Sequence, residues 1–171
     1  PSGHFSIVKY TGNNNNWENP ATVGHGLNSA PDCILLKALG AADQWECFFS
    51  NYNTTSTGGA TAANASFALD TDAALYTSQT YKTWGGVMPT SSVFTVDGNN
   101  ANGTETEGII AYCFANIEGF IKVGSYVGNA NTDGTFVYTG FRPSFMMCKP
   151  VVAGNWRIQD TKRSPFNVAA A

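Results

Sequence analysis

Charged side chains are scarce in this sequence. Lys, Arg, Asp and Glu make up 12% of its 171 residues, about half the share that is usual in globular domains. The nine Lys and Arg residues are scattered, and only Lys162 and Arg163 are adjacent. Binding to nucleic acid phosphates needs clustered cations, so we expect no nucleic-acid partner. The polar surface must come from Asn, Thr, Ser and Gly, which favour strands and turns over helices.

Long apolar runs and metal-binding cysteine motifs are also missing. No apolar run approaches the ~20 residues of a membrane span and no signal peptide is recognisable, so we expect no membrane insertion. The cysteines form no CxxC pair, which argues against a zinc site. Each lies in an apolar run, and we interpret them as buried thiols, with a disulfide as the alternative. The four are Cys33, Cys47, Cys113 and Cys148.

What the sequence does contain is a series of short apolar runs separated by turn-rich spacers. The runs are rich in β-branched and aromatic residues, which is typical of strands. Asp97-Gly98 and Asp133-Gly134 are dipeptides that favour hairpin turns. The Ala-rich stretch 60–74 is interpreted as a loop with a short strand near 67–69. The expected strands span 5–10, 33–37, 45–49, 92–96, 109–115, 120–127, 135–138, 145–149 and 156–159.

Nine or more short strands with regular turns predict an all-β fold, an antiparallel β-sandwich of the jelly-roll kind. At this length we expect a single domain over residues 1–171.

An internal duplication is the best-supported feature of the sequence. Both halves have the order Y-x-G-N, turn, G-(L/F), P-x5-K, short loop, W, with the same spacing from proline to lysine. This predicts repeat 1 at about 5–50, an intervening segment at 51–118, repeat 2 at about 119–167, and a pseudo-twofold sandwich. The matched residues are Tyr10 with Tyr126, Gly12 with Gly128, Pro31 with Pro143, Lys37 with Lys149, and Trp45 with Trp156.

Roles for the matched residues follow from their chemistry. Gly12 and Gly128 are expected at turns that need a positive φ. Trp45 and Trp156 are expected to cap the core with the indole N–H at a polar rim, and a sugar-stacking role is the alternative.

Residues that could support catalysis are few. His4 and His25 are the only histidines, and no G-x-S-x-G motif accompanies them, so we interpret His25 as a turn residue with its ring at the surface. Two acidic pairs could suit glycoside hydrolysis, but they lie in polar loops where nothing raises a carboxyl pKa. No enzyme activity and no cofactor are therefore expected. The acidic pairs are Asp70 with Asp72 and Glu105 with Glu107.

Two loops could bind a ligand. Asn129, Asn131 and Asp133 are spaced like the first ligands of a calcium loop, although the Glu that normally ends such a loop is absent, and a plain hairpin turn is the competing interpretation. Asn14 and Asn15 lie in an Asn run followed by Trp17, and amides beside an indole can hold a neutral sugar. The alternative is an exposed loop whose Trp folds back onto the sheet. Glycosylation sequons also occur, at Asn53, Asn64 and Asn102.

Several motifs in one order resemble an uncharacterised β domain of tailed phages that is common in phages of marine bacteria and cyanobacteria. They include residues 10–13 (YTGN), 23–27 (VGHGL), 89–96 (PTSSVFTV), 110–115 (IAYCFA), 136–143 (FVYTGFRP) and 160–163 (DTKR).

The resemblance covers nearly the whole chain and implies a non-enzymatic structural protein on the surface of a virion. The expected role is capsid decoration or a tail or appendage fibre domain, in assembly or host attachment. The partners implied are other virion proteins, further copies of the chain and host-surface glycans. A carbohydrate-binding module that uses Trp17 and the Asn-rich loops is the alternative function.

Overall fold

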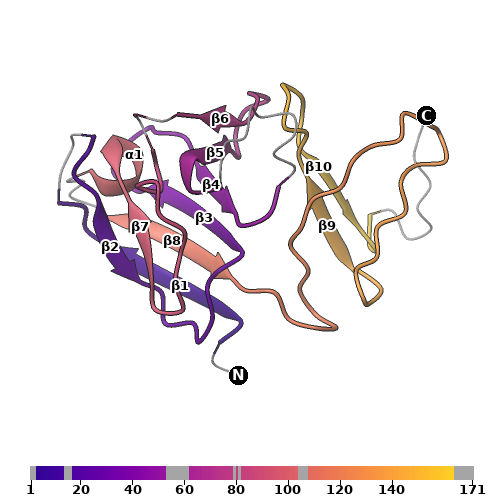
Figure 1. The fold of residues 1–171 in the computed structure, drawn as a ribbon, viewed down its shortest axis with the longest axis horizontal. Coiled ribbons are helices and arrows are strands. Elements are labelled where there is room, and N and C mark those ends of the chain that lie inside the picture. Colours follow the sequence, from indigo (N-terminus) through magenta and orange to yellow (C-terminus); the bar gives the residue numbers. More distant parts are fainter. Residues whose placement is uncertain are drawn as a thin grey trace.

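A computed structural model describes residues 3–13, 17–52, 62–78, 80, 82–103 and 108–163. As predicted, the fold is nearly all β, and the strands pair antiparallel (Figure 1). The elements are β1 (Phe5–Tyr10), β2 (Ala21–Gly24), β3 (Cys33–Ala38), β4 (Glu46–Phe49), the 3-10 turn η2 (Ala62–Asn64), β5 (Ala65–Ala68), β6 (Tyr76–Thr77), β7 (Val93–Val96), α1 (Gly98–Asn102), β8 (Ile109–Phe114), β9 (Phe145–Cys148) and β10 (Arg157–Asp160).

The main sheet has six strands in the order β1-β8-β3-β4-β5-β6, and β2 pairs with β7 separately. Alternate residues of β3 and β8 point to one side of the main sheet, where Ile34 and Ala111 are fully buried. Val23 of β2 and Phe94 of β7 pack against them in one core cluster. The main sheet and the β2–β7 pair thus enclose a core between two layers, which fits the expected sandwich.

The opposite face of the main sheet is also apolar. By register, Ile7 of β1 lies opposite Tyr112 of β8, and Tyr112 lies opposite Leu35 of β3. Trp45 stacks on Tyr112 at a ring distance of 6.2 Å, so this tryptophan covers the outer face of the sheet and not the inner core. We call this side the outer face.

The last two strands form a separate two-stranded sheet, which stands apart from the main sheet in Figure 1. Its register repeats that of β3 and β4. In both hairpins the residue before the shared lysine lies opposite the residue after the shared tryptophan: Leu36 faces Glu46, and Cys148 faces Arg157. The duplication itself stays a prediction, because the two hairpins belong to different sheets and not to equivalent places in one sandwich.

The shared lysines also act alike. The Lys37 ammonium donates to the carbonyls of Ala41 at 3.0 Å and Asp43 at 2.7 Å, within its own hairpin loop. The Lys149 ammonium donates to the carbonyl of Gly154, again within its own loop. In each hairpin, a charged donor therefore binds a carbonyl of a loop that lacks regular pairing. The second acceptors differ, since Lys149 also donates to the carbonyl of Ala73, outside its hairpin, at 2.7 Å.

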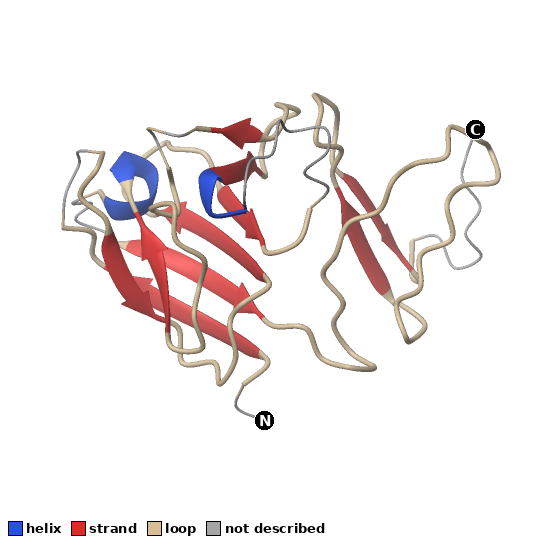
Figure 2. Cartoon of the chain, in the orientation of Figure 1, coloured by secondary structure: helices blue, strands red, loops and turns tan. Residues whose placement is uncertain are grey.

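Two expected strands do not form. Residues 120–127 and 135–138 carry the alternating apolar pattern but form no strand, apart from an isolated bridge between Ile117 and Ile121, and most of this region is drawn as loop in Figure 2. The strand pattern describes side chains, whereas a strand also needs a neighbour to pair with its backbone. The hairpin expected at Asp97-Gly98 is also wrong, since Gly98 begins α1, although its φ is positive at 72°, as this dipeptide favours. Its N–H donates to the Asp97 carboxylate at 2.8 Å.

The expected positive φ at Gly12 and Gly128 is wrong, because neither residue is among the glycines with a positive φ. A different constraint acts at Gly12. A Cβ placed there would lie 2.2 Å from the carbonyl oxygens of Asn102 and Gly103, whereas one at Gly128 would meet nothing within 4 Å. The close approach of the 102–103 backbone therefore explains why residue 12 is a glycine, whereas residue 128 has space for a larger side chain.

The Gly12→Ala variant should therefore lose about 1–3 kcal/mol of unfolding free energy, because β1 and the 102–103 segment must separate. Gly128→Ala, at the matched position, should change it by less than about 0.5 kcal/mol. Urea unfolding of the two variants measures both values. Equal losses would contradict the close approach at Gly12.

Candidate functional site

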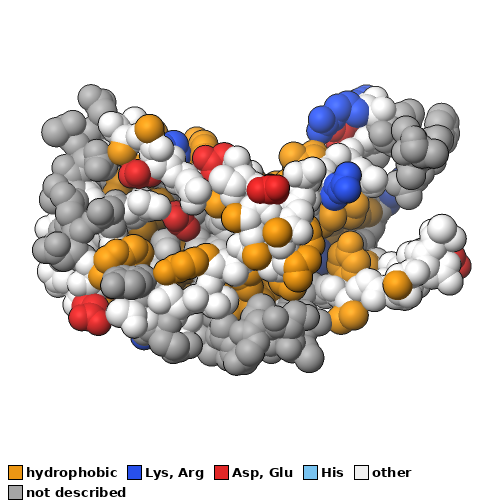
Figure 3. All heavy atoms as spheres, turned by 90° about the horizontal axis from the view of Figure 1, so that it is seen from above, with side chains coloured by type: hydrophobic (Ala, Val, Ile, Leu, Met, Phe, Trp, Pro, Cys, Tyr) orange, Lys and Arg blue, Asp and Glu red, His pale blue; other side chains and the backbone are white. Residues whose placement is uncertain are grey.

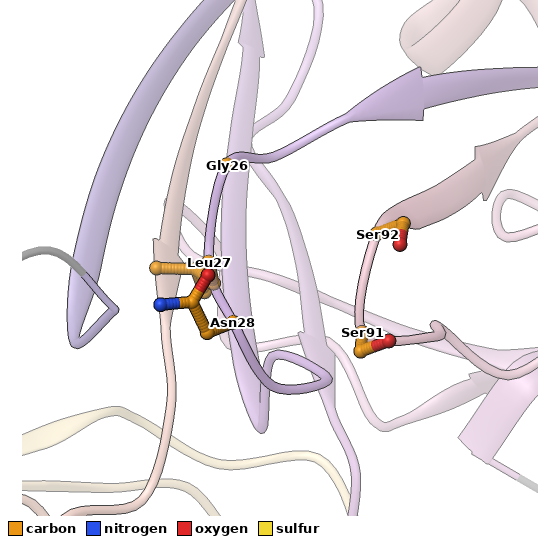
Figure 4. Close-up of a pocket in the computed structure, with 5 residues that line it drawn as sticks. All are labelled: Gly26, Leu27, Asn28, Ser91 and Ser92. Carbon is orange, nitrogen blue, oxygen red and sulfur yellow. The ribbon is translucent and has the colours of Figure 1, made fainter.

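One open depression lies beside the turn that follows β2 (Figure 4). It is lined by Gly26, Leu27, Asn28, Ser91 and Ser92. The two serine side chains lie on the β7 side of the depression, across from Asn28. None of these five side chains is an acid or a base near neutral pH.

His25 is next to this depression, and the expectation of a surface ring is wrong, since the residue is 1% exposed. Its Nδ1 accepts the N–H of Leu27 at 3.0 Å, which places the ring proton on Nε2, 3.1 Å from the carbonyl oxygen of Thr90. Both nitrogens are therefore engaged by the backbone. Neither is available as a base for Ser91 or Ser92, so the ring fastens the turn to the start of β7.

A second depression is a groove between β1 and β2, next to the Asn-rich loop. Its polar end is formed by Asn13 and Asn102, whose side chains hydrogen-bond to each other at 3.0 Å. The Tyr10 hydroxyl donates to the carbonyl of Ala101 at 2.6 Å, and burial raises the pKa of this phenol. Asn102 is 1% exposed, so it could not accept a glycan at its sequon. Asn53, at another sequon, lies outside the described residues, and Asn64 is half-buried.

Of the three residues expected to contact glycans, the structure describes only Trp17. Asn14 and Asn15 lie outside the described residues. The Trp17 ring packs over Gly98, where an added Cβ would lie 2.4 Å from the ring. The neighbouring Glu18 N–H donates to the buried carboxylate of Asp97 at 3.0 Å. The half-buried indole therefore folds back against the start of α1. The sugar-binding role of this loop stays a prediction.

The expected calcium loop uses its side-chain oxygens internally. The Asn129 side-chain oxygen accepts the N–H of Asn131 at 3.1 Å, and that of Asn131 accepts the N–H of Asp133 at 3.1 Å. These are Asx turns, which stabilise a loop without a metal. Calcium binding at this loop stays a prediction. Across the described ranges, no three His, Cys, Asp or Glu side chains gather where a metal ion could bind.

The acidic residues that could have served catalysis do not form a described pair in a pocket. Asp70 and Asp72 are exposed, and Glu105 and Glu107 lie outside the described residues. His4, the other histidine, is exposed beside β1.

A buried acid that the sequence analysis did not single out is Glu46, on β4. Its carboxylate accepts the Ser66 hydroxyl and, at 3.0 Å, the amide of Asn100. Because both carboxylate oxygens have donors, Glu46 links β4 to its neighbouring strand β5 and to α1. In the sequence, Glu46 lies within the apolar run 45–49 (WECFF), and nothing in that run indicates a buried acid with hydrogen-bond donors.

The cysteines are all free thiols. Cys33, Cys47 and Cys113 are buried as expected, whereas Cys148 is half-buried. Burial raises the pKa of Cys33 and Cys113 to about 12, and it raises the pKa of Cys47 as well. Their thiolate fraction near neutral pH is therefore about a thousandfold below that of an ordinary cysteine.

An alkylating reagent should thus modify Cys148 first in the folded chain and reach the other three only after unfolding. Mass spectrometry of timed samples, with and without denaturant, measures the order of modification. Modification of Cys113 as fast as Cys148 in the folded protein would contradict the described packing.

The most unusual surface belongs to residues 116–163, which we call the arm; we call residues 3–115 the body. Large apolar side chains of the arm project into solvent: Phe136 is 86% exposed and Tyr138 is 78% exposed. Tyr126, on the same arm, has its pKa raised mainly by the nearby Cys148 thiol, which places this residue beside β9. Further arm residues with large exposed side chains are Phe120, Val127, Val137, Phe145, Met146, Val152 and Ile158.

The arm is fastened to the body at the loop of its hairpin. The Trp156 indole N–H donates to the carbonyl of Ala68 at 2.9 Å, as expected for an indole at a polar rim, and its ring packs against Phe49 and Phe67. The backbone N–H groups of Leu75 and Gly154 complete the junction by donating to Val151 at 2.9 Å and Asp72 at 2.7 Å.

These observations define an all-β protein with two open depressions, neither of them lined by an acid–base pair, and an apolar arm. The chain belongs to a family described as a domain of unknown function, DUF7483, whose model matches residues 1–171. No curated protein and no solved structure matches the chain. No helix in the described part of the chain is long and apolar enough to cross a membrane.

Proposed function

We propose that this protein is a non-enzymatic structural module on the surface of a virus particle, either a capsid decoration or a tail or appendage domain. The observation that carries the proposal is the arm. An apolar surface of this extent is typical of a docking site and unusual on a free monomer. The low charge and the exposed edge of the main sheet at β1 suit a rigid module that binds neighbouring proteins.

The depressions support the non-enzymatic part of the proposal. The histidine next to the first depression has both nitrogens bound to backbone groups, and the buried Glu46 has both oxygens bound to donors. Neither group can exchange a proton with a substrate without breaking these hydrogen bonds. The resemblance to a β domain of tailed phages agrees with a structural role and supplies no catalytic residues.

Immunogold electron microscopy of purified particles tests the proposal. An antibody raised against this chain should label the head or the tail of particles of the encoding virus. Mass spectrometry of the same particles should find the chain in stoichiometric amounts. Particles that lack the chain would overturn the proposal.

A carbohydrate-binding module remains the alternative, because the groove between β1 and β2 has amide groups of Asn13 and Asn102 at one end, close in sequence to the Trp17 loop. A glycan array with the wild-type chain and Trp17→Ala separates the two functions. Glycan binding that Trp17→Ala abolishes would favour the alternative, and binding no greater than background would remove it.

A further inference from the structure

The arm exposes enough apolar surface to form an interface. Fully exposed aromatic side chains present about 200 Å² each, so the five exposed aromatics of the arm present about 700 Å². The largest apolar patch on a typical monomer is about 300–600 Å², and a standard interface buries about 800 Å² per partner. Summed over the arm, this apolar area is comparable to one side of a protein–protein contact. The five are Phe120, Tyr126, Phe136, Tyr138 and Phe145.

Charge indicates which protein could cover the arm. Residues 1–115 contain three Lys or Arg and nine Asp or Glu, whereas residues 116–171 contain six Lys or Arg and three Asp or Glu. The chain's net charge of -3 thus divides into -6 and +3. In Figure 3 most Asp and Glu atoms lie to the left and centre, and Lys and Arg gather mainly at the right, over the arm. The two parts of different copies therefore attract each other.

The body carries a surface that could receive an arm. On the outer face of β1, Phe5 is 48% exposed and Ile7 is 56% exposed. The Phe5 ring packs against Phe114 at 4.8 Å, which extends the apolar surface onto β8. β1 is also an end strand of the main sheet, so one side of its backbone has no neighbouring strand in the described part of the chain. Exposed end strands of this kind readily accept another chain.

The arm of the same copy does not cover this surface. The contacts of Trp156 and Lys149 hold the arm against β5 and the 72–75 segment. In the strand order of the main sheet, β5 lies near the edge opposite to β1. With the arm fixed there, both apolar surfaces remain exposed, and Figure 3 shows the molecule hollowed between its two ends. One chain therefore presents two different apolar surfaces, one on the arm and one on β1, in segments whose net charges are opposite.

We propose that the arm of one copy docks on the outer face of β1 in a second copy, so that the chains assemble head to tail. This inference deepens the proposed function and rests on it for the biological role of the assembly. A contact between two unlike surfaces is heterologous, and it builds rings when the rotation closes and filaments when it does not. Either product suits a component of a particle surface.

Analytical ultracentrifugation of the full chain tests the inference over a range of micromolar concentrations. The wild-type chain should self-associate, and more weakly at about 1 M than at about 0.1 M salt, since the screening length falls from about 10 Å to about 3 Å. An arm variant, Phe136→Ser with Tyr138→Ser, and a body variant, Phe5→Ser with Ile7→Ser, should each associate at least tenfold more weakly. Thermal unfolding checks that each variant is folded.

A matched control and a mixing experiment separate this contact from others. Tyr76→Ser with Val87→Ser removes apolar side chains of similar exposure outside both surfaces, and it should leave self-association unchanged. Mixing the arm variant with the body variant should restore a one-to-one complex, because each supplies the surface that the other lacks. A contact between identical surfaces would not be restored by mixing.

Three results would overturn the inference: a wild-type chain that is monomeric at every concentration, a control that weakens association as much as the two variants, or a mixture that forms no complex. A monomeric chain that is nevertheless found on particles would leave the proposed function intact. A self-associating chain that is absent from particles would overturn the proposed function alone.

Discussion

Replacing Leu36 with alanine is expected to lower the free energy of unfolding by about 3–5 kcal/mol. Leu36 lies at the centre of β3, is fully buried and belongs to the core cluster between the main sheet and the β2–β7 pair. Alanine would remove apolar contacts and leave a cavity that the surrounding strands cannot fill, because β3 is paired on both edges. Urea unfolding followed by tryptophan fluorescence measures the loss.

The same substitution three residues further along the chain is the matched control. Leu39 follows β3 directly and is 45% exposed, so Leu39→Ala should cost less than about 1 kcal/mol. The difference between the two variants reports burial alone, since residue type and replacement are identical. A small loss at Leu36 would mean that the core does not lie between these two layers.

All strands of the main sheet except the two-residue β6 could be predicted, because alternating side chains point to the two faces of a sheet. In β8, Ile109, Ala111 and Cys113 are buried, and the intervening residues are half-buried on the outer face. The strands β3, β4 and β7 were predicted from short apolar runs, each within one or two residues of its observed bounds.

The same local signal failed in the arm for a physical reason. Residues 120–127 and 135–138 have the composition of strands, but pairing depends on a partner elsewhere in the chain, and local sequence does not identify it. The error at His25 has the same origin. Its glycine neighbours predict a turn, but its ring is buried and binds the carbonyl of Thr90, which lies 65 residues away in sequence.

The candidate sites, too, could be predicted from the sequence only in part. Trp17 could be singled out as an unusual residue of a loop, but its contact with Gly98 depends on where α1 begins. The exposed arm could not be predicted, because apolar residues in a strand-like pattern are normally taken as core. A signal was nevertheless present in the sequence, since the positive charge of residues 116–171 contrasts with the negative charge of residues 1–115.

The attachment of the arm leads to the last prediction, which concerns Trp156. This residue combines ring contacts with Phe49 and Phe67 and a hydrogen bond to Ala68. A two-stranded sheet of four-residue strands is only marginally stable in water, so the β9–β10 hairpin depends on this junction. Loss of the indole should therefore release the hairpin and leave the main sheet folded.

Trp156→Ala should cost the hairpin about 2 kcal/mol of local stability, which corresponds to amide hydrogen exchange about 30-fold faster across β9 and β10. Trp156→Phe keeps a ring but removes the donor to Ala68, and it should accelerate exchange only about fivefold, as expected for one hydrogen bond. Amides of β3 and β8 serve as the internal control in both variants. Equal acceleration in the hairpin and the main sheet would show that the two unfold together. Acceleration confined to the hairpin would instead establish the arm as a separately stabilised unit, held by its junction with the body.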